Sequence, residues 1–124
     1  MPKPRPTYLN LFQIRMPVPA FISILHRVTG AALFLSIPLL LYLLDLSLQT
    51  EQSFALFKST LAHPFMKLLL IGLVWAYLHH LCAGIRHLAL DLHYGVGLEA
   101  ARATSWAVLA VSVGLALVFG ATIW

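Results

Sequence analysis

Three polar residues and a glycine in one apolar stretch form a pattern that suits ligation and proton chemistry: His80, Gly84, His87 and Asp91. At about 100° per residue of helix they fall within about 60° of one another and form a stripe about 16 Å long. An imidazole is costly inside a membrane, and ionisable groups there usually face a bundle interior, where they ligate, relay protons or contact a ligand. The alternative for His80 is an interhelical hydrogen bond inside the bundle. The spacing alone favours neither this alternative nor a ligand role.

Helix geometry limits what this stripe could do for a haem. His79 points about 100° away from His80, and adjacent residues on one helix cannot supply both axial ligands of an iron. If His80 binds haem, the second axial ligand must come from elsewhere. His87 lies about 10 Å along the same face, too far for the same iron but well placed to donate to a propionate. Gly84 could make room for a flat macrocycle or for close helix packing.

A second polar group lies in an earlier apolar stretch, where Ser23, His26 and Arg27 project to neighbouring positions of a helix. The later stretch ends in three polar residues, Arg86, His87 and Asp91. If the two helices run in opposite directions, these residues reach the same membrane boundary as Ser23, His26 and Arg27. Ser, Thr and Gly would let the backbones approach. For Ser23 and Arg27 the alternative is that they are interfacial anchors and packing contacts. His26, Arg27 and Arg86 are further candidates for propionate contacts.

Length and composition decide which elements must position these residues. With 124 residues and only four acidic side chains, the chain cannot cover a water-facing surface. Three stretches are long enough to cross a hydrocarbon core of about 30 Å. We therefore expect an all-α membrane protein with one domain over residues 1–124, an N-terminal inner-face segment over 1–21, and membrane helices at about 23–48, 65–90 and 105–124.

Local signals refine this layout. The first helix should start after Pro19, Pro64 suits the first turn of the second, and Gly95 with Gly97 should break the chain after it. A signal peptide is not expected, because a polar, Pro-rich segment precedes the first apolar stretch. The single cysteine, Cys82, allows no intrachain disulfide and suits packing.

The basic residues indicate an orientation. They cluster before and in the first turns of the first helix, at Lys3, Arg5, Arg15 and Arg27. The connection over 49–64 balances Lys58 against Glu51, so the N-terminus should face the cytoplasm, with the 91–104 loop on the same side. The net charge of +4 does not predict nucleic-acid binding, because the basic residues are scattered and half lie at membrane boundaries.

Two motifs carry a resemblance to a known family. Residues 23–30 read S-x-x-H-R-x-T-G and residues 80–91 read H-x-x-x-G-x-R-H-x-x-x-D, with Arg5-Pro6 before Leu9 upstream of both. In this combination the chain resembles, over nearly its whole length, the cytochrome b membrane-anchor subunits of bacterial succinate dehydrogenase, respiratory complex II. The resemblance implies a haem-binding bundle that a second anchor subunit completes, in the bacterial inner membrane.

The resemblance also implies residue roles. His80 matches the family's axial ligand of haem b, and the second axial histidine belongs to the other anchor subunit. Ser23 and Arg27 match residues that line the ubiquinone site, where a hydroxyl and a guanidinium would stabilise an oxygen that becomes anionic on reduction. His26, Arg86 and His87 are candidates for haem propionate or proton-path contacts, and Asp91 is a candidate for the proton path.

The implied partners are an iron–sulfur subunit docked on the inner face and a flavoprotein subunit, because this chain has no Gly-rich dinucleotide motif and no cysteine cluster. Three alternatives stay open: a haem-free structural anchor, a fumarate reductase anchor, and a small proton or ion transporter that uses His80, His87 and Asp91 as a relay.

Overall fold

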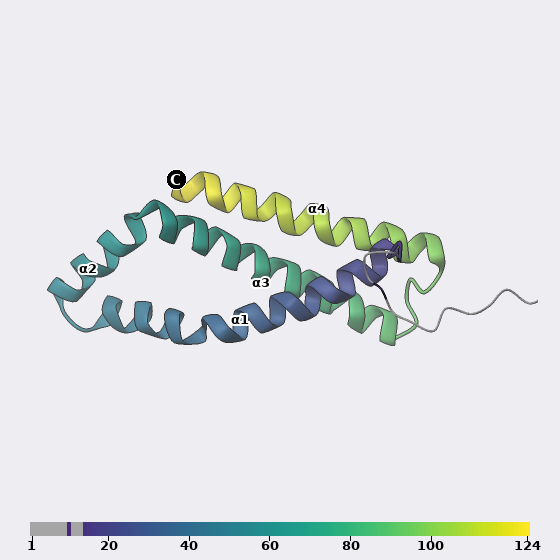
Figure 1. Cartoon of the computed structure of the whole chain (residues 1–124), viewed down its shortest axis with the longest axis horizontal. Helices are drawn as coiled ribbons and strands as arrows, with labels where there is room; N and C mark the ends of the chain where they lie inside the picture. The colour runs from purple at the N-terminus through teal and green to yellow at the C-terminus, as the bar shows by residue number, and fades with distance from the viewer. Residues whose placement is uncertain (1–9, 11–13) are drawn as a thin grey trace, which may run out of the picture.

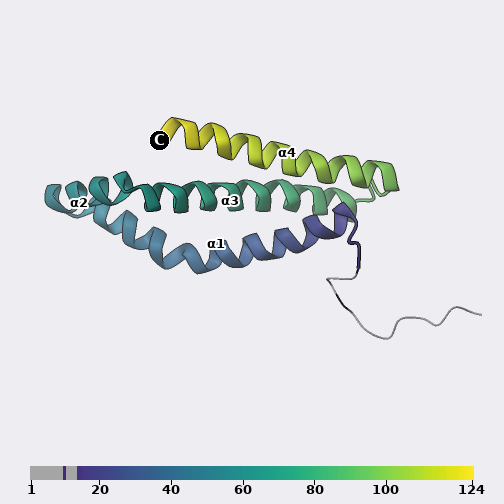
Figure 2. The same ribbon diagram turned by 45° about the horizontal axis from the view of Figure 1, so that its top comes forward.

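The computed structural model describes residues 10 and 14–124, which fold into α1 (Val18–Leu48), α2 (Glu51–Ala62), α3 (Pro64–Asp91) and α4 (Leu98–Ile123). No strand occurs in this part of the chain. Three of the described helices, α1, α3 and α4, are long and apolar enough to cross a membrane, which confirms the predicted all-α architecture with three spans. Figures 1 and 2 show these three helices lengthwise, with α3 packed against both α1 and α4.

The helix boundaries differ from the predicted ones at two places. α1 begins at Val18, before Pro19, because a proline in the first turn removes only an N–H that would have no helical partner. α4 begins at Leu98 with Glu99 in its first turn, so the connection after α3 covers only residues 92–97. α3 lies within one residue of its predicted bounds at each end.

The connection between the first two spans contains a helix that the sequence did not predict. α2 starts after Thr50, whose hydroxyl accepts from the backbone N–H of Ser53 at 3.0 Å, while the Ser53 hydroxyl receives the Thr50 N–H at 2.9 Å. This capping box satisfies two backbone donors at the helix start. α2 links the far ends of α1 and α3, which separate from each other on that side of the bundle (Figure 1).

The core lies where the three spans meet. Ile22 of α1, Ala83 of α3 and Val108 of α4 are buried against one another, and Cys82 packs beside them. The buried face of α4 carries small side chains, which permits a close approach to α3; its members are Ser105, Val108, Ser112 and Ala116. Most of the large apolar side chains are exposed in the single chain, as expected for surfaces that meet lipid or another subunit.

Two local backbone features shape the bundle: a proline inside α1 and a chain reversal after α3. α1 is bent along its length (Figure 2), and it contains Pro38, which cannot donate a backbone hydrogen bond and pushes the preceding turn away. After α3 the chain reverses through His93 (φ 66°) and Gly95 (φ 71°), both in the left-handed region. The predicted break near Gly95 is therefore confirmed, and α4 returns alongside α3.

Candidate functional site

The predicted stripe on α3 packs against the first half of α1. The His80 Nδ1 atom lies 3.0 Å from the backbone oxygen of His26, and the two imidazole rings are stacked with centroids 4.1 Å apart and planes 6° from parallel. A carbonyl oxygen can only accept, so Nδ1 must carry the proton and donate it. The lone pair of the neutral ring is then on Nε2, the nitrogen that is left for a metal.

The rest of the stripe surrounds His26. A carbon attached to Gly84 at the Cβ position would lie 3.4 Å from the His26 Nε2 atom, so the His26 ring lies within contact distance of Gly84. The His87 ring meets the His26 ring edge-on, with centroids 5.0 Å apart. His80, Gly84 and His87 thus share one face of α3, whereas Asp91 is the exposed last residue of the helix.

Ser23 and Arg27 lie one turn apart on α1, just before this crossing. Ser23 is partly buried, and its hydroxyl makes no hydrogen bond to another described residue. Every other described serine and threonine has such a bond, in most cases to a carbonyl of its own helix. Arg27 is exposed and likewise forms no ion pair or hydrogen bond within residues 10 and 14–124. Two donors at this boundary therefore have no partner among the residues that the structure describes.

Arg86 lies on a different face of α3 and packs against α4. Its guanidinium donates to the Thr104 hydroxyl at 3.0 Å and to the Ala101 carbonyl at 3.2 Å, and the residue is only 8% exposed. The structure therefore separates Arg86 from the cluster around His26, with which the sequence had grouped it as a candidate propionate contact.

His79 shares this second face of α3. Its side chain is fully buried (0% exposed) beside the Trp75 ring, with ring centroids 5.5 Å apart. Neither of its ring nitrogens nor the Trp75 indole N–H has a hydrogen-bond partner among the described residues. The expectation that His79 points away from His80 agrees with this placement, but its complete burial was not predicted.

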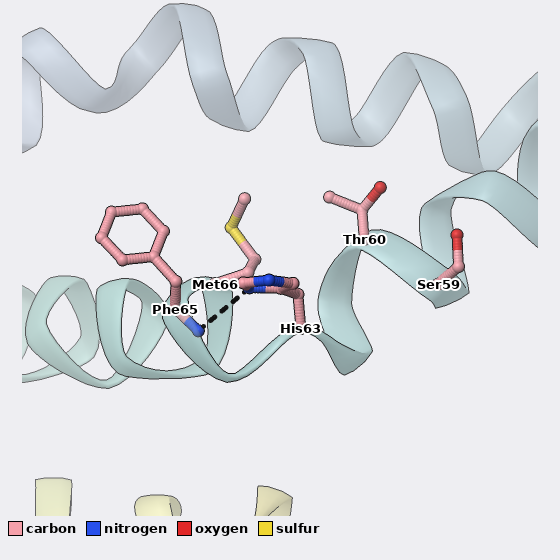
Figure 3. Close-up of a pocket in the computed structure, with 5 residues that line it drawn as sticks. All are labelled: Ser59, Thr60, His63, Phe65 and Met66. Carbon is pink, nitrogen blue, oxygen red and sulfur yellow. Dashed lines mark hydrogen bonds between the residues drawn. The ribbon is translucent and has the colours of Figure 1, made fainter.

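A pocket of about 350 Å³ lies at the opposite end of the bundle, where α2 meets α3 (Figure 3). Its lining residues are Ser59, Thr60, His63, Phe65 and Met66. His63 caps α3, because its Nδ1 accepts the Phe65 backbone N–H at 3.2 Å. This end carries none of the predicted site residues, and His63 is exposed there.

The residues at the α1–α3 crossing fit a haem axial ligand. A ligating histidine normally donates its other ring N–H to a carbonyl or carboxylate, which fixes the tautomer and the ring orientation. His80 makes such a bond, which is the interhelical hydrogen bond given above as the alternative to ligation. The two roles are compatible, because the bond uses only Nδ1 and no described residue is hydrogen-bonded to Nε2. Lys3, Arg5-Pro6 and Leu9, which carried part of the orientation and resemblance arguments, lie outside the described residues.

Comparison with known proteins places these features in a family. Residues 1–119 match the family model of the succinate dehydrogenase/fumarate reductase transmembrane subunit. The chain is similar to the succinate dehydrogenase cytochrome b556 subunit of Coxiella burnetii, with 37% identity over 121 residues and 97% of each chain covered. It is 36% identical over 113 residues to the subunit of that name from Paracoccus denitrificans, with 91% of this chain and 87% of the relative covered. Against the Rickettsia felis subunit the identity is 34% over 113 residues, covering 91% and 88% of the two chains.

Proposed function

Because the chain belongs to the family of succinate dehydrogenase and fumarate reductase transmembrane subunits, we propose that it is the cytochrome b anchor of a succinate:ubiquinone oxidoreductase. In this role it binds haem b and forms part of the ubiquinone site, while succinate is oxidised in partner subunits. The relatives named as succinate dehydrogenase subunits favour this direction over fumarate reduction. The observation that carries the proposal is the hydrogen bond from His80 to the His26 carbonyl.

His80 is the residue of this chain that would hold the haem iron. Its Nδ1–H is held by a backbone carbonyl, which sets the ring orientation and leaves Nε2 to ligate. A histidine of a second anchor subunit would hold the iron together with His80. Haem b, when bound, supplies one-electron redox chemistry, and the protein sets its position and electrostatic surroundings.

Ser23 and Arg27 form this chain's side of the quinone site. Reduction places negative charge on a quinone oxygen, and preorganised donors aimed at that oxygen stabilise the charge as it develops. The Ser23 hydroxyl and the Arg27 guanidinium are both free of other described partners, so neither must break a bond to donate. The support is this availability, together with their separation of one helical turn.

The neighbouring polar residues have secondary roles. His26 and His87, with rings 5.0 Å apart, are placed for a haem propionate or a proton path, and Asp91 belongs to the water-facing end of such a path. Arg86 would have to give up its bonds to Thr104 and Ala101 before it could serve the same face of α3.

The proposal extends to the assembly. The end of the bundle where α1 begins and α3 ends carries exposed Arg15, Arg27 and Arg102 beside the exposed acids Asp91 and Glu99, and this mixed, mainly basic surface suits docking of an iron–sulfur subunit with its flavoprotein. This end faces the cytoplasm, with the protein in the bacterial inner membrane as a multi-pass anchor.

The test is a His80→Ala variant in the complete complex, analysed by a reduced-minus-oxidised spectrum. Loss of an axial ligand should abolish or shift the b-type spectrum while membrane insertion is retained. His79→Gln is the matched control, because it alters the adjacent histidine but keeps a polar group of similar size at a fully buried position. An unchanged spectrum in His80→Ala, or equal losses in both variants, would refute the assignment.

A further inference from the structure

Gly30 lies where α1 crosses α3, directly against the His80 ring. A carbon in the Cβ position of residue 30 would be 2.8 Å from His80 Cε1 and 3.2 Å from Nδ1. The first distance is shorter than any ordinary carbon–carbon contact, so a side chain at residue 30 requires the ring or the crossing to move. At Gly72 and Gly114 the same carbon would have no neighbour within 4 Å.

The His80 ring has little freedom to move away. Its Nδ1 is bonded to the His26 carbonyl, and the His26 ring is stacked on it at 4.1 Å. The acceptor is a backbone atom of α1 and is fixed by that helix; the Thr29 hydroxyl lies 3.0 Å from it but shares its one proton with the Leu25 carbonyl at 2.8 Å. A shift of the ring by several tenths of an ångström would therefore lengthen the Nδ1–H bond or disturb the stacking.

We propose that Gly30 is a positioning residue for His80: the absence of a side chain there lets the imidazole lie in the α1–α3 crossing with its Nδ1–H on the His26 carbonyl, so that the direction of Nε2 is set. This inference rests on the proposed role of His80 as a haem ligand. Outer contacts that orient a metal ligand typically change metal affinity by about 10- to 100-fold when they are lost.

The experiment compares glycine-to-alanine variants of the complete complex. Gly30→Ala should lower haem affinity by about 10-fold or more. Where haem is retained, its low-spin electron paramagnetic resonance signals and midpoint potential should shift. Alanine is the better helix former, so helix propensity predicts no loss.

Two controls separate this effect from a general packing effect. Gly72→Ala adds a methyl group with no neighbour, and Gly120→Ala adds one at 3.3 Å from Ile71 Cδ1, in a helix contact away from His80. Both should keep the haem content, the resonance signals and the potential of the parent complex. Equal changes in Gly120→Ala and Gly30→Ala would overturn the inference.

The two proposals fail in different ways. If His80→Ala keeps an unchanged b-type spectrum, the proposed ligand is wrong and Gly30 has no ligand to position. If His80→Ala loses or shifts the haem but Gly30→Ala retains the parent haem affinity, resonance signals and potential, the ligand assignment stands and the positioning role of Gly30 is wrong.

Discussion

Ser23 differs from the other described serines and threonines because its hydroxyl has no hydrogen bond to a described residue that it would have to give up. If it donates to a quinone oxygen, Ser23→Ala should lower succinate–quinone reductase activity by about 10²-fold, the order of loss seen when one oxyanion donor is removed. Succinate oxidation with an artificial acceptor that takes electrons upstream should barely change. Comparing the two assays on one preparation measures the effect.

Ser36→Ala provides the matched control for this prediction. Ser36 is a buried serine of the same helix whose hydroxyl already donates to the Leu33 carbonyl at 2.7 Å, so its removal should leave quinone reduction intact. A haem-loaded Ser23→Ala complex with normal quinone reduction and unaltered sensitivity to quinone-site inhibitors would show that Ser23 only packs between helices. Arg27→Leu should also lower activity, but a loss of assembly could contribute to that result.

At this scale the sequence could group His80, Gly84 and His87, because helical periodicity alone places them on one face. It could not show what that face meets, since contacts with His26 depend on where α1 crosses. The sequence also did not predict that His79 is buried or that Arg86 contacts α4, because both depend on how the helices pack around α3. A signal did exist: Ala76, His79, Ala83 and Arg86 recur at helical spacing and form the buried face of α3.

One buried cation, Arg86, contributes to the contact between α3 and α4. Thr104→Val removes the hydroxyl that accepts from Arg86 Nε at 3.0 Å and keeps a side chain of similar shape. Interhelical hydrogen bonds in membranes contribute about 0.6 kcal/mol on average and about 1.7 kcal/mol at most. The variant should therefore lose about 1 kcal/mol of stability, measured by unfolding of the detergent-solubilised complex.

Thr122→Val is the control within the same helix, because the exposed Thr122 hydroxyl bonds only to the Phe119 carbonyl of α4. It should change stability by less than Thr104→Val does. Both variants should keep the haem spectrum, because Arg86 and Thr104 lie away from the His80 face. Equal stabilities of the two variants would show that the Arg86–Thr104 bond does not hold α4 in place.

The three spans could be predicted because each is a long apolar run, whereas their ends depended on weaker signals. α4 extends back to Leu98 through residues that favour helix but are too polar to count as a membrane span. α2 was not predicted, for two reasons. Its mean hydropathy is too low for a membrane span, and its capping box has Ser53 where the usual sequence signal has Glu or Gln. Hydropathy finds what crosses a membrane better than it finds what lies beside it.

On the scale of the whole molecule, charge differs between the two ends of the bundle. Exposed Arg15, Arg27 and Arg102 lie with Asp91 and Glu99 at the end where α1 begins, while the α2 end has Lys58 and Lys67 with Asp45 and Glu51. An excess of Lys and Arg marks the cytoplasmic side. The α2 end should therefore face away from the cytoplasm.

This orientation can be tested with a single introduced cysteine. In a Cys82→Ala background, Gln52→Cys places a thiol on an exposed position of α2. A membrane-impermeant thiol reagent should label it in intact spheroplasts and fail to label it in sealed inverted vesicles. The parent chain is the control, since Cys82 is partly buried within a membrane span and should resist the reagent in both preparations. Labelling of Gln52→Cys only in inverted vesicles would reverse the topology, and it would place Ser23 and Arg27 on the side opposite to a cytoplasmic iron–sulfur subunit, so the proposed electron route would fail with it.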